Sequence, residues 1–324
     1  MYSIIVLIAV ATSLMAPTLL RWTLQHVVPD KQEAKRLQLE ELARESSLAR
    51  VNRVLLPVRL REGPNRFNLQ RIETYLVEKL ENNLALTLFT VTPAGSRTKA
   101  VAFLNEMSRL FTHAEVSKKV VESSRPATEI LNEAQKDYDL IIVGASEKTS
   151  DSDTLFNPLT DQLVQLAPCP TMIVKGTRVT EHWPPKRILV PTNGSASARS
   201  AAEVAFRLAR AEQVQVTLLN VIESEKRGDY RFDSSERSRD RQLSSAHQIV
   251  ESLRVLGESQ AVRVEARVLI GGSPEGVILE VAKDFDLIVL GTGARPRLER
   301  IFLGPRVETV LDTASCPVVV INSA

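Results

Sequence analysis

Cysteine is almost absent from the 324-residue chain, and this scarcity excludes a fold held together by disulfide bonds. The two that occur, Cys169 and Cys316, lie far apart in the sequence, which fits a reducing cytosol. The four histidines have no cysteine or carboxylate at metal-ligand spacing, so no metal site is expected. The net charge is only +2 and no basic face is evident, which argues against a nucleic-acid partner.

Signatures of catalysis are also lacking. Ser195 follows an expected strand, but its surroundings do not read Gly-x-Ser-x-Gly, and no histidine is placed to complete a triad. No lysine follows the glycines in the way that a P-loop requires. The chain is therefore not expected to be an enzyme.

Short apolar runs separated by helical patterns make up most of the chain. Residues 287–290 form one run that ends at Gly291, and residues 317–321 form another. Both are expected to be strands buried on both faces of a parallel sheet. Between them an arginine-rich loop leads to a helix that is expected to begin at or near Gly304. Free backbone NH groups at such a helix start favour an anion such as phosphate.

The same arrangement occurs earlier, in residues 139–174. Matching positions are separated by one constant offset: Gly144 and Gly291, Asn157-Pro158 and Gly304-Pro305, Cys169-Pro170 and Cys316-Pro317. This internal repeat predicts two domains, 52–175 and 186–324, which a hydrophobic content of 44% can supply with two cores. Strand and helix alternate in both, which predicts an α/β fold of two tandem, doubly wound, five-stranded parallel sheets.

Two local signals within the second domain lead to opposite expectations. Ser273 followed by Pro274 is typical of an N-cap and the first residue of a helix. Residues 223–241 are charged and rich in serine, so we expect a solvated loop without regular structure. A phosphorylation or docking site is the alternative for that segment.

The longest uncharged stretch is at the start of the chain. Residues 2–20 carry no charge, and roughly 20 apolar residues suffice to cross a bilayer as a helix. We predict a transmembrane helix over residues 2–22, with the following basic residues placing the C-terminal side in the cytoplasm. A secretory signal, or a hydrophobic helix packed on a soluble domain, is the alternative. Residues 23–51 are expected to form a connecting helix and linker, with a coiled coil as the other possibility.

Each repeat resembles a universal stress protein domain of the UspA type. The resemblance covers nearly all of residues 53–324, and its most specific parts are the opening strand ILVPTNGS, the closing SCPVVVI and the spacing of Gly291, Ala294 and Gly304. It implies a doubly wound, Rossmann-like fold and, as in the ATP-binding members, a site for an adenine nucleotide.

The resemblance also implies which residues would bind ATP or another adenine nucleotide in the second domain. Those lining the adenine and ribose would be Pro191, Asn193 and Val221. Those surrounding the phosphates would be Gly291, Gly293, Ala294, Gly304, Pro305 and Arg306.

Three of these positions depart from the family pattern. Asn193 stands where Asp is usual, which keeps hydrogen bonding but removes a charge. Ala294 replaces a glycine and adds a Cβ where the backbone must come close. Pro305 replaces a hydroxyl residue and removes a backbone NH from the helix start. Arg306, together with the loop arginines, could supply compensating positive charge.

The first domain departs further and is expected to be degenerate. Arg59 follows its first strand, Glu147 replaces the second glycine, and Asn157-Pro158 replaces the third glycine and the hydroxyl residue. A carboxylate in this loop would repel phosphate. We therefore expect this domain to bind no nucleotide and to pair with the second domain within the chain, as an intramolecular version of the family's dimer.

The apolar start of the chain carries a second resemblance. Residues 1–22, with Pro17 inside and Arg21-Trp22 at the boundary, resemble the last transmembrane helix of the monovalent cation/proton antiporter family 2. Bacterial members of that family can carry tandem stress domains as a cytoplasmic tail. Residues 2–20 contain no carboxylate for a cation site, so transport would need a separate antiporter transmembrane subunit as partner.

Taken together, these features favour a single-pass membrane protein whose tandem universal stress domains face the cytoplasm and act as a sensor or regulatory module in the stress response. One alternative is the C-terminal regulatory tail of a Na⁺ or K⁺/proton antiporter. A soluble, nucleotide-dependent stress protein is another.

Overall fold

The structure is a computed structural model. It describes residues 51–59, 65–81, 83–145, 158–176, 183–210, 214–224, 232–292, 295–297, 300–302 and 305–322. The predicted transmembrane helix at residues 2–22 lies outside these ranges, as does nearly all of the connecting segment. None of the helices in the described part of the chain is long and apolar enough to cross a bilayer.

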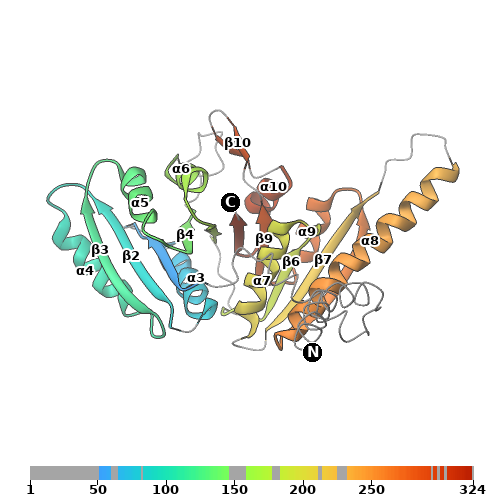
Figure 1. The fold of residues 1–324 in the computed structure, drawn as a ribbon, viewed down its shortest axis with the longest axis horizontal. Coiled ribbons are helices and arrows are strands. Elements are labelled where there is room, and N and C mark those ends of the chain that lie inside the picture. The colour runs from blue at the N-terminus through green and yellow to red at the C-terminus, as the bar shows by residue number, and fades with distance from the viewer. Residues whose placement is uncertain are drawn as a thin grey trace, which may run out of the picture. The chain divides into compact units, whose positions relative to one another are not determined.

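The first half of the described chain is a five-stranded parallel sheet with helices on both faces (Figure 1). Its elements are β1 (Arg53–Pro57), α3 (Asn65–Leu80), β2 (Ala85–Thr92), α4 (Arg97–Ser108), β3 (Glu115–Glu122), α5 (Pro126–Ala134), β4 (Leu140–Gly144), α6 (Pro158–Leu166) and β5 (Thr171–Lys175). The strand order is β3-β2-β1-β4-β5, and each pair within it is parallel. The central strands read as continuous apolar runs because both of their faces are covered.

The second half repeats this topology. Its elements are β6 (Arg187–Pro191), α7 (Ala196–Arg210), β7 (Gln215–Glu223), α8 (Phe232–Ser259), β8 (Arg263–Gly271), α9 (Pro274–Ala282), β9 (Leu287–Thr292), β10 (Arg295–Arg297), β11 (Arg300–Phe302), α10 (Pro305–Thr313) and β12 (Val318–Asn322). The parallel sheet has the order β8-β7-β6-β9-β12, which matches that of the first half strand for strand. The α/β fold with two tandem parallel-sheet domains is therefore confirmed.

Several local predictions in the second half are also confirmed. The two apolar runs that bracket the Arg-rich segment form β9 and β12, which are parallel neighbours. Helix α10 begins at Pro305, next to the predicted start at Gly304. Ser273 caps α9, because its Oγ accepts a hydrogen bond from the backbone NH of Gly276 at 3.2 Å.

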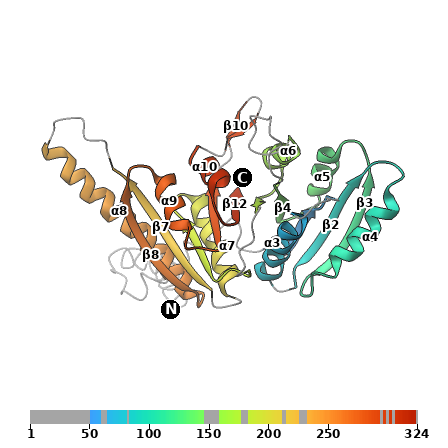
Figure 2. The same cartoon turned by 180° about the vertical axis from the view of Figure 1, so that it is seen from behind.

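Two expectations about irregular segments were wrong. The arginine-rich segment predicted as a loop contains a short antiparallel hairpin of β10 and β11. The segment 223–241, predicted to lack regular structure, includes the first ten residues of α8 from Phe232 onward. The first turns of α8 lie beyond the ends of β7 and β8 (Figure 2). They continue a helix whose later residues, such as Val250 and Leu253, are buried.

An aspartate repeats at the start of the fourth strand of each domain. Asp139 accepts hydrogen bonds through Oδ2 from the backbone NH groups of Asn52 and Arg53, both at 2.8 Å. Asp286 does the same for Lys186 and Arg187, at 2.9 and 3.0 Å. Each carboxylate therefore ties the first strand to the fourth, and the internal repeat extends to individual hydrogen bonds.

The two sheets are joined through their last strands. β5 pairs with β12 in antiparallel fashion, with Val174 opposite Val319, so that ten strands form one hydrogen-bonded sheet. Ile173 of β5 also packs in the hydrophobic core of the second domain. Next to this junction the Lys175 ammonium lies 2.8 Å from a carboxylate oxygen of Asp312. The two domains are thus held together by apolar contacts and by main-chain hydrogen bonds.

Candidate functional site

The candidate nucleotide site of the second domain lies where three parallel strands end. Pro191 is the last residue of β6, Val221 is near the end of β7, and Gly291 is near the end of β9. β6 lies between β7 and β9, so the sheet brings these three predicted residues to one edge. In open α/β sheets this edge, at the carboxyl ends of the strands, is where ligands bind. Pro191 is buried and Val221 is partly buried.

Asn193 lies in the turn between β6 and α7. Its Oδ1 accepts a hydrogen bond from the backbone NH of Ser195 at 3.0 Å, and Ser195 Oγ accepts one from Ala198 NH at 3.3 Å. The amide oxygen of Asn193 therefore shapes the turn that starts α7, a common role for asparagine. The side chain remains exposed, at the edge of the sheet where the resemblance implied a ribose contact.

Gly291 has a structural reason to be glycine that the sequence did not reveal. A Cβ at this position would lie 2.0 Å from the carbonyl oxygen of Ser197 and 2.5 Å from the backbone nitrogen of Ala198. The first turn of α7 therefore packs directly on the backbone of β9. A role toward phosphate and this helix–strand contact both call for the absence of a side chain.

Arg306, in the first turn of α10, is engaged by two carboxylates. Its Nη2 lies 2.6 Å from Oε2 of Glu223 at the end of β7, and its Nε lies 3.7 Å from Oε2 of Glu275 in the first turn of α9. The sequence prediction of a guanidinium available for phosphate missed both partners. Glu275 carried a signal, since it follows Pro274 in a helix first turn where acidic residues are favoured.

Most of the remaining residues predicted to surround the phosphates lie outside the described part of the chain. Gly293, Ala294 and Gly304 lie outside the described residues, and Pro305 is described only as the first residue of α10. The described residues of this edge are thus Pro191, Asn193, Val221 and Gly291, three of which the resemblance assigns to the adenine and ribose. At the phosphate end, the guanidinium of Arg306 would have to exchange a carboxylate for a phosphate.

Neither cysteine has the environment of a reactive thiol. Burial, and to a smaller extent the charge of Asp139, raises the pKa of Cys169 to about 11. Burial and Asp286 raise the pKa of Cys316 to about 12. Both thiols therefore stay protonated at neutral pH. Among the described residues, no group of three or more histidine, cysteine or acidic side chains is arranged to hold a metal ion.

The fold is a tandem pair of doubly wound α/β domains. Two segments of the chain, residues 5–175 and 184–322, match the model of the universal stress protein family. The chain therefore belongs to the universal stress protein family and carries two of its domains.

Individual relatives agree with this assignment. A universal stress protein of Methanocaldococcus jannaschii is 32% identical over 140 residues, covering 42% of this chain and 82% of that protein. The universal stress protein E homolog of Haemophilus influenzae is 25% identical over 222 residues, covering 62% of this chain and 68% of that protein.

Two solved structures share the tandem fold. A universal stress protein from Archaeoglobus fulgidus superposes with a TM-score of 0.58 at 19% identity, covering 85% of this chain and 100% of that one. The cytoplasmic domain of a prokaryotic cation chloride cotransporter gives a TM-score of 0.54 at 8% identity, with coverage of 85% and 96%. At these identities the likeness concerns the fold alone.

Proposed function

We propose that the chain is a membrane-attached regulatory module whose second domain senses an adenine nucleotide, and that it acts without catalysing a reaction. The observation that carries the nucleotide part is the position of Arg306. The guanidinium lies at the ligand edge of the sheet, against Glu223 of β7 and Glu275 of α9. An arginine paired with an exposed carboxylate such as that of Glu223 can exchange it for a phosphate, because a carboxylate and a phosphate form charge-assisted hydrogen bonds of similar geometry with a guanidinium.

Such an exchange suits a sensor. Without nucleotide, Arg306 connects α10 to the end of β7 and to α9. With nucleotide, the phosphate would take over one of these contacts, and the free energy of binding would differ between the two arrangements. The adenine would rest at Pro191 and Val221, and the polar turn at Asn193 would face the ribose.

Calorimetric titration of the full chain with ATP, ADP, AMP and cyclic dinucleotides tests this proposal. The variant Arg306→Gln is expected to weaken binding about tenfold, and Glu223→Gln to strengthen it by removing the competing carboxylate. Arg254→Gln is the matched control, since it removes a partly exposed arginine that pairs with Glu251 and Glu258 on α8. Absence of saturable binding by every nucleotide would overturn the nucleotide part.

Membrane attachment rests on residues 2–22 and requires its own test. Cells that express the full chain, or a chain without these residues, can be fractionated and compared. The full chain should be found in the membrane fraction and the shortened chain in the soluble fraction. Protease added to the cytoplasmic side should digest the stress domains. If both forms are found in the soluble fraction, the result would support the alternative of a soluble nucleotide-dependent stress protein.

The second candidate function is the regulatory tail of a cation/proton antiporter. Its support is the fold, since a cytoplasmic domain of a cation chloride cotransporter has the same tandem arrangement. Co-purification of an antiporter transmembrane subunit would favour this candidate, and further apolar spans encoded directly upstream would do so as well. A regulatory module that acts alone predicts neither.

A further inference from the structure

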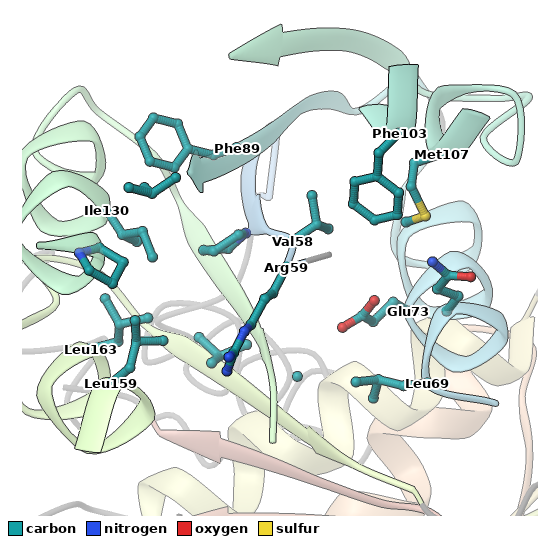
Figure 3. Close-up of a pocket in the computed structure, with 16 residues that line it drawn as sticks. Val58, Arg59, Leu69, Glu73, Phe89, Phe103, Met107, Ile130, Leu159 and Leu163 are labelled. Atoms are coloured by element: carbon teal, nitrogen blue, oxygen red, sulfur yellow. The ribbon is translucent and has the colours of Figure 1, made fainter. Parts of the chain in front are cut away.

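The first domain, expected to be degenerate, contains a cavity of about 420 Å³. It opens at the carboxyl ends of β1, β2 and β4 and is enclosed by the four helices of that domain (Figure 3). Protein interiors are packed nearly as tightly as organic crystals, and their voids are seldom larger than a water molecule. Ligand pockets measure roughly 300–1,000 Å³, so this cavity has the size of a binding site.

The walls of the cavity are mostly apolar. Side chains from β2 and from α4, α5 and α6 supply this surface: Phe89, Phe103, Met107, Ile130, Leu159 and Leu163. The polar side chains come from the β1 end and from α3: Arg59, Gln70 and Glu73. A ligand that fills the cavity must therefore have a large apolar body and a polar group at one end.

Arg59 is the positive group at this polar end. Its side chain extends between Leu159 on one side and Glu73 on the other (Figure 3). The residue is exposed, and no hydrogen bond or ion pair of its guanidinium is found among the described residues. A guanidinium that lies beside apolar walls and has no counter-ion in the described part of the chain favours a ligand that carries a single anionic group.

Glu73 disfavours a nucleotide in the same place. Its carboxylate is buried, has interactions of its own, and lies against Gly144, where an added Cβ would come within 2.5 Å of Oε1. Gly144 corresponds to Gly291 of the second domain, the glycine at which a phosphate was predicted. A buried carboxylate at this point repels the multiple charges of a polyphosphate, whereas a single carboxylate further out at Arg59 avoids it.

We propose that this cavity binds an apolar monocarboxylate, with the hydrocarbon or aromatic body between α4, α5 and α6 and the carboxylate paired with Arg59. The site is independent of the nucleotide site proposed for the second domain. The two domains would then respond to ligands of different chemistry.

Fluorescence titration of the full chain with 2-naphthoate tests the proposal, with 2-naphthylmethanol as the uncharged ligand of similar shape. We expect saturable one-to-one binding of 2-naphthoate. Arg59→Gln should weaken 2-naphthoate about tenfold and leave 2-naphthylmethanol unchanged, because only the charged partner loses its ion pair. Leu159→Trp should weaken binding of both ligands, because the larger indole occupies part of the cavity. Arg254→Gln should change neither.

Thermal melts of each variant keep the test interpretable. Arg59 is exposed and at a strand end, so Arg59→Gln should melt like the parent even if Leu159→Trp does not fold. Absence of binding to the parent chain, or equal binding by parent and Arg59→Gln, would overturn the proposal. In the Arg306→Gln variant, the nucleotide site proposed for the second domain is weakened. If ATP displaced 2-naphthoate from this variant, the proposal would also be overturned, since the cavity would then be a nucleotide site of the first domain.

Discussion

The two domains share a topology but differ in the side chain that they bury at one equivalent helix position. The next-to-last residue of α5 is Glu133, whereas that of α9 is Val281, which packs against the core of the second domain. Glu133 is only 5% exposed and is surrounded by Lys119, Lys136 and Tyr138. The first domain thus has a charged network where the second domain has apolar packing.

This difference shows how a duplicated unit can change its interior without changing its fold. Burial alone would raise the pKa of Glu133, but hydrogen bonds from Lys119, Lys136 and Tyr138 outweigh it and lower the pKa to about 2. The backbone of α5 is compatible with either solution, because each satisfies the group that it buries. The shared fold therefore says little about the chemistry that each domain can hold.

The largest difference between the domains is expected at the matched glycines. Gly291→Ala places its Cβ against backbone atoms of α7, which cannot move aside, and should cost about 3 kcal/mol of unfolding free energy. Gly144→Ala meets side-chain atoms of Leu69 and Glu73, which can shift, and should cost about 1 kcal/mol. Urea unfolding of both variants measures this difference, and equal costs would contradict the contacts described here.

The repeated aspartates should behave alike, with a smaller effect. Asp286→Ala removes the acceptor of two backbone NH groups at the start of β6 and should cost about 2 kcal/mol in urea unfolding. Asp139→Ala should cost slightly less, because Asp139 is less buried. The Asn variants retain one acceptor oxygen and should lose about half as much. A cost at only one of the two positions would break the equivalence of the repeats.

The Glu133 network should give the first domain an acid-sensitive part of its stability. Since the pKa of Glu133 falls from 4.5 to about 2 on folding, its contribution is complete above pH 4.5 and is lost as the pH falls toward 2. Glu133→Gln should therefore cost roughly 2 kcal/mol at pH 7 and progressively less below pH 4.5.

The matched control for this experiment is Glu280→Gln. Glu280 is 73% exposed and pairs with Lys283 on the surface of α9, so this change should leave the stability within about 0.5 kcal/mol at any pH. A pH-independent cost for Glu133→Gln would show that the cost is one of packing and not of charge.

The smallest effect concerns the two cysteines and leaves stability unchanged. Alkylation by iodoacetamide at pH 8 should be roughly 100-fold slower in the folded chain than in urea, because burial raises both thiol pKa values. Cys316 is the more buried and should react more slowly than Cys169. Mass spectrometry resolves the two sites, and rapid labelling of Cys316 would contradict its burial in the second core.

The parallel sheets could be predicted because their signal is local. Apolar runs such as residues 287–290 need no information about neighbours to be recognised as buried strands, and Ser273 with Pro274 marks a helix start within two residues. The hairpin of β10 and β11 could not be predicted in this way, since its strands have three residues each and no alternating pattern. The helical structure of the first turns of α8 could not be predicted for a similar reason, because their sequence has no apolar stripe.

Much less of the candidate sites could be predicted. The resemblance placed Pro191, Asn193, Val221 and Gly291 at one edge of the sheet, and the structure brings them there. It could not show that Glu223 and Glu275 approach Arg306, because they come from separate elements. The cavity at Arg59 could not be predicted either, because its lining residues come from separate strands and helices of the first domain.

The pairing of β5 with β12 has a consequence for assembly. Both strands that meet at the centre of the sheet belong to one polypeptide, so each domain finds its partner at an effective concentration that dilution cannot change. The strands left at the outer edges, β3 and β8, carry charged side chains such as Lys118 and Arg263, which discourage further strand addition. Association of the two halves is therefore encoded in a single gene product and does not vary with expression level.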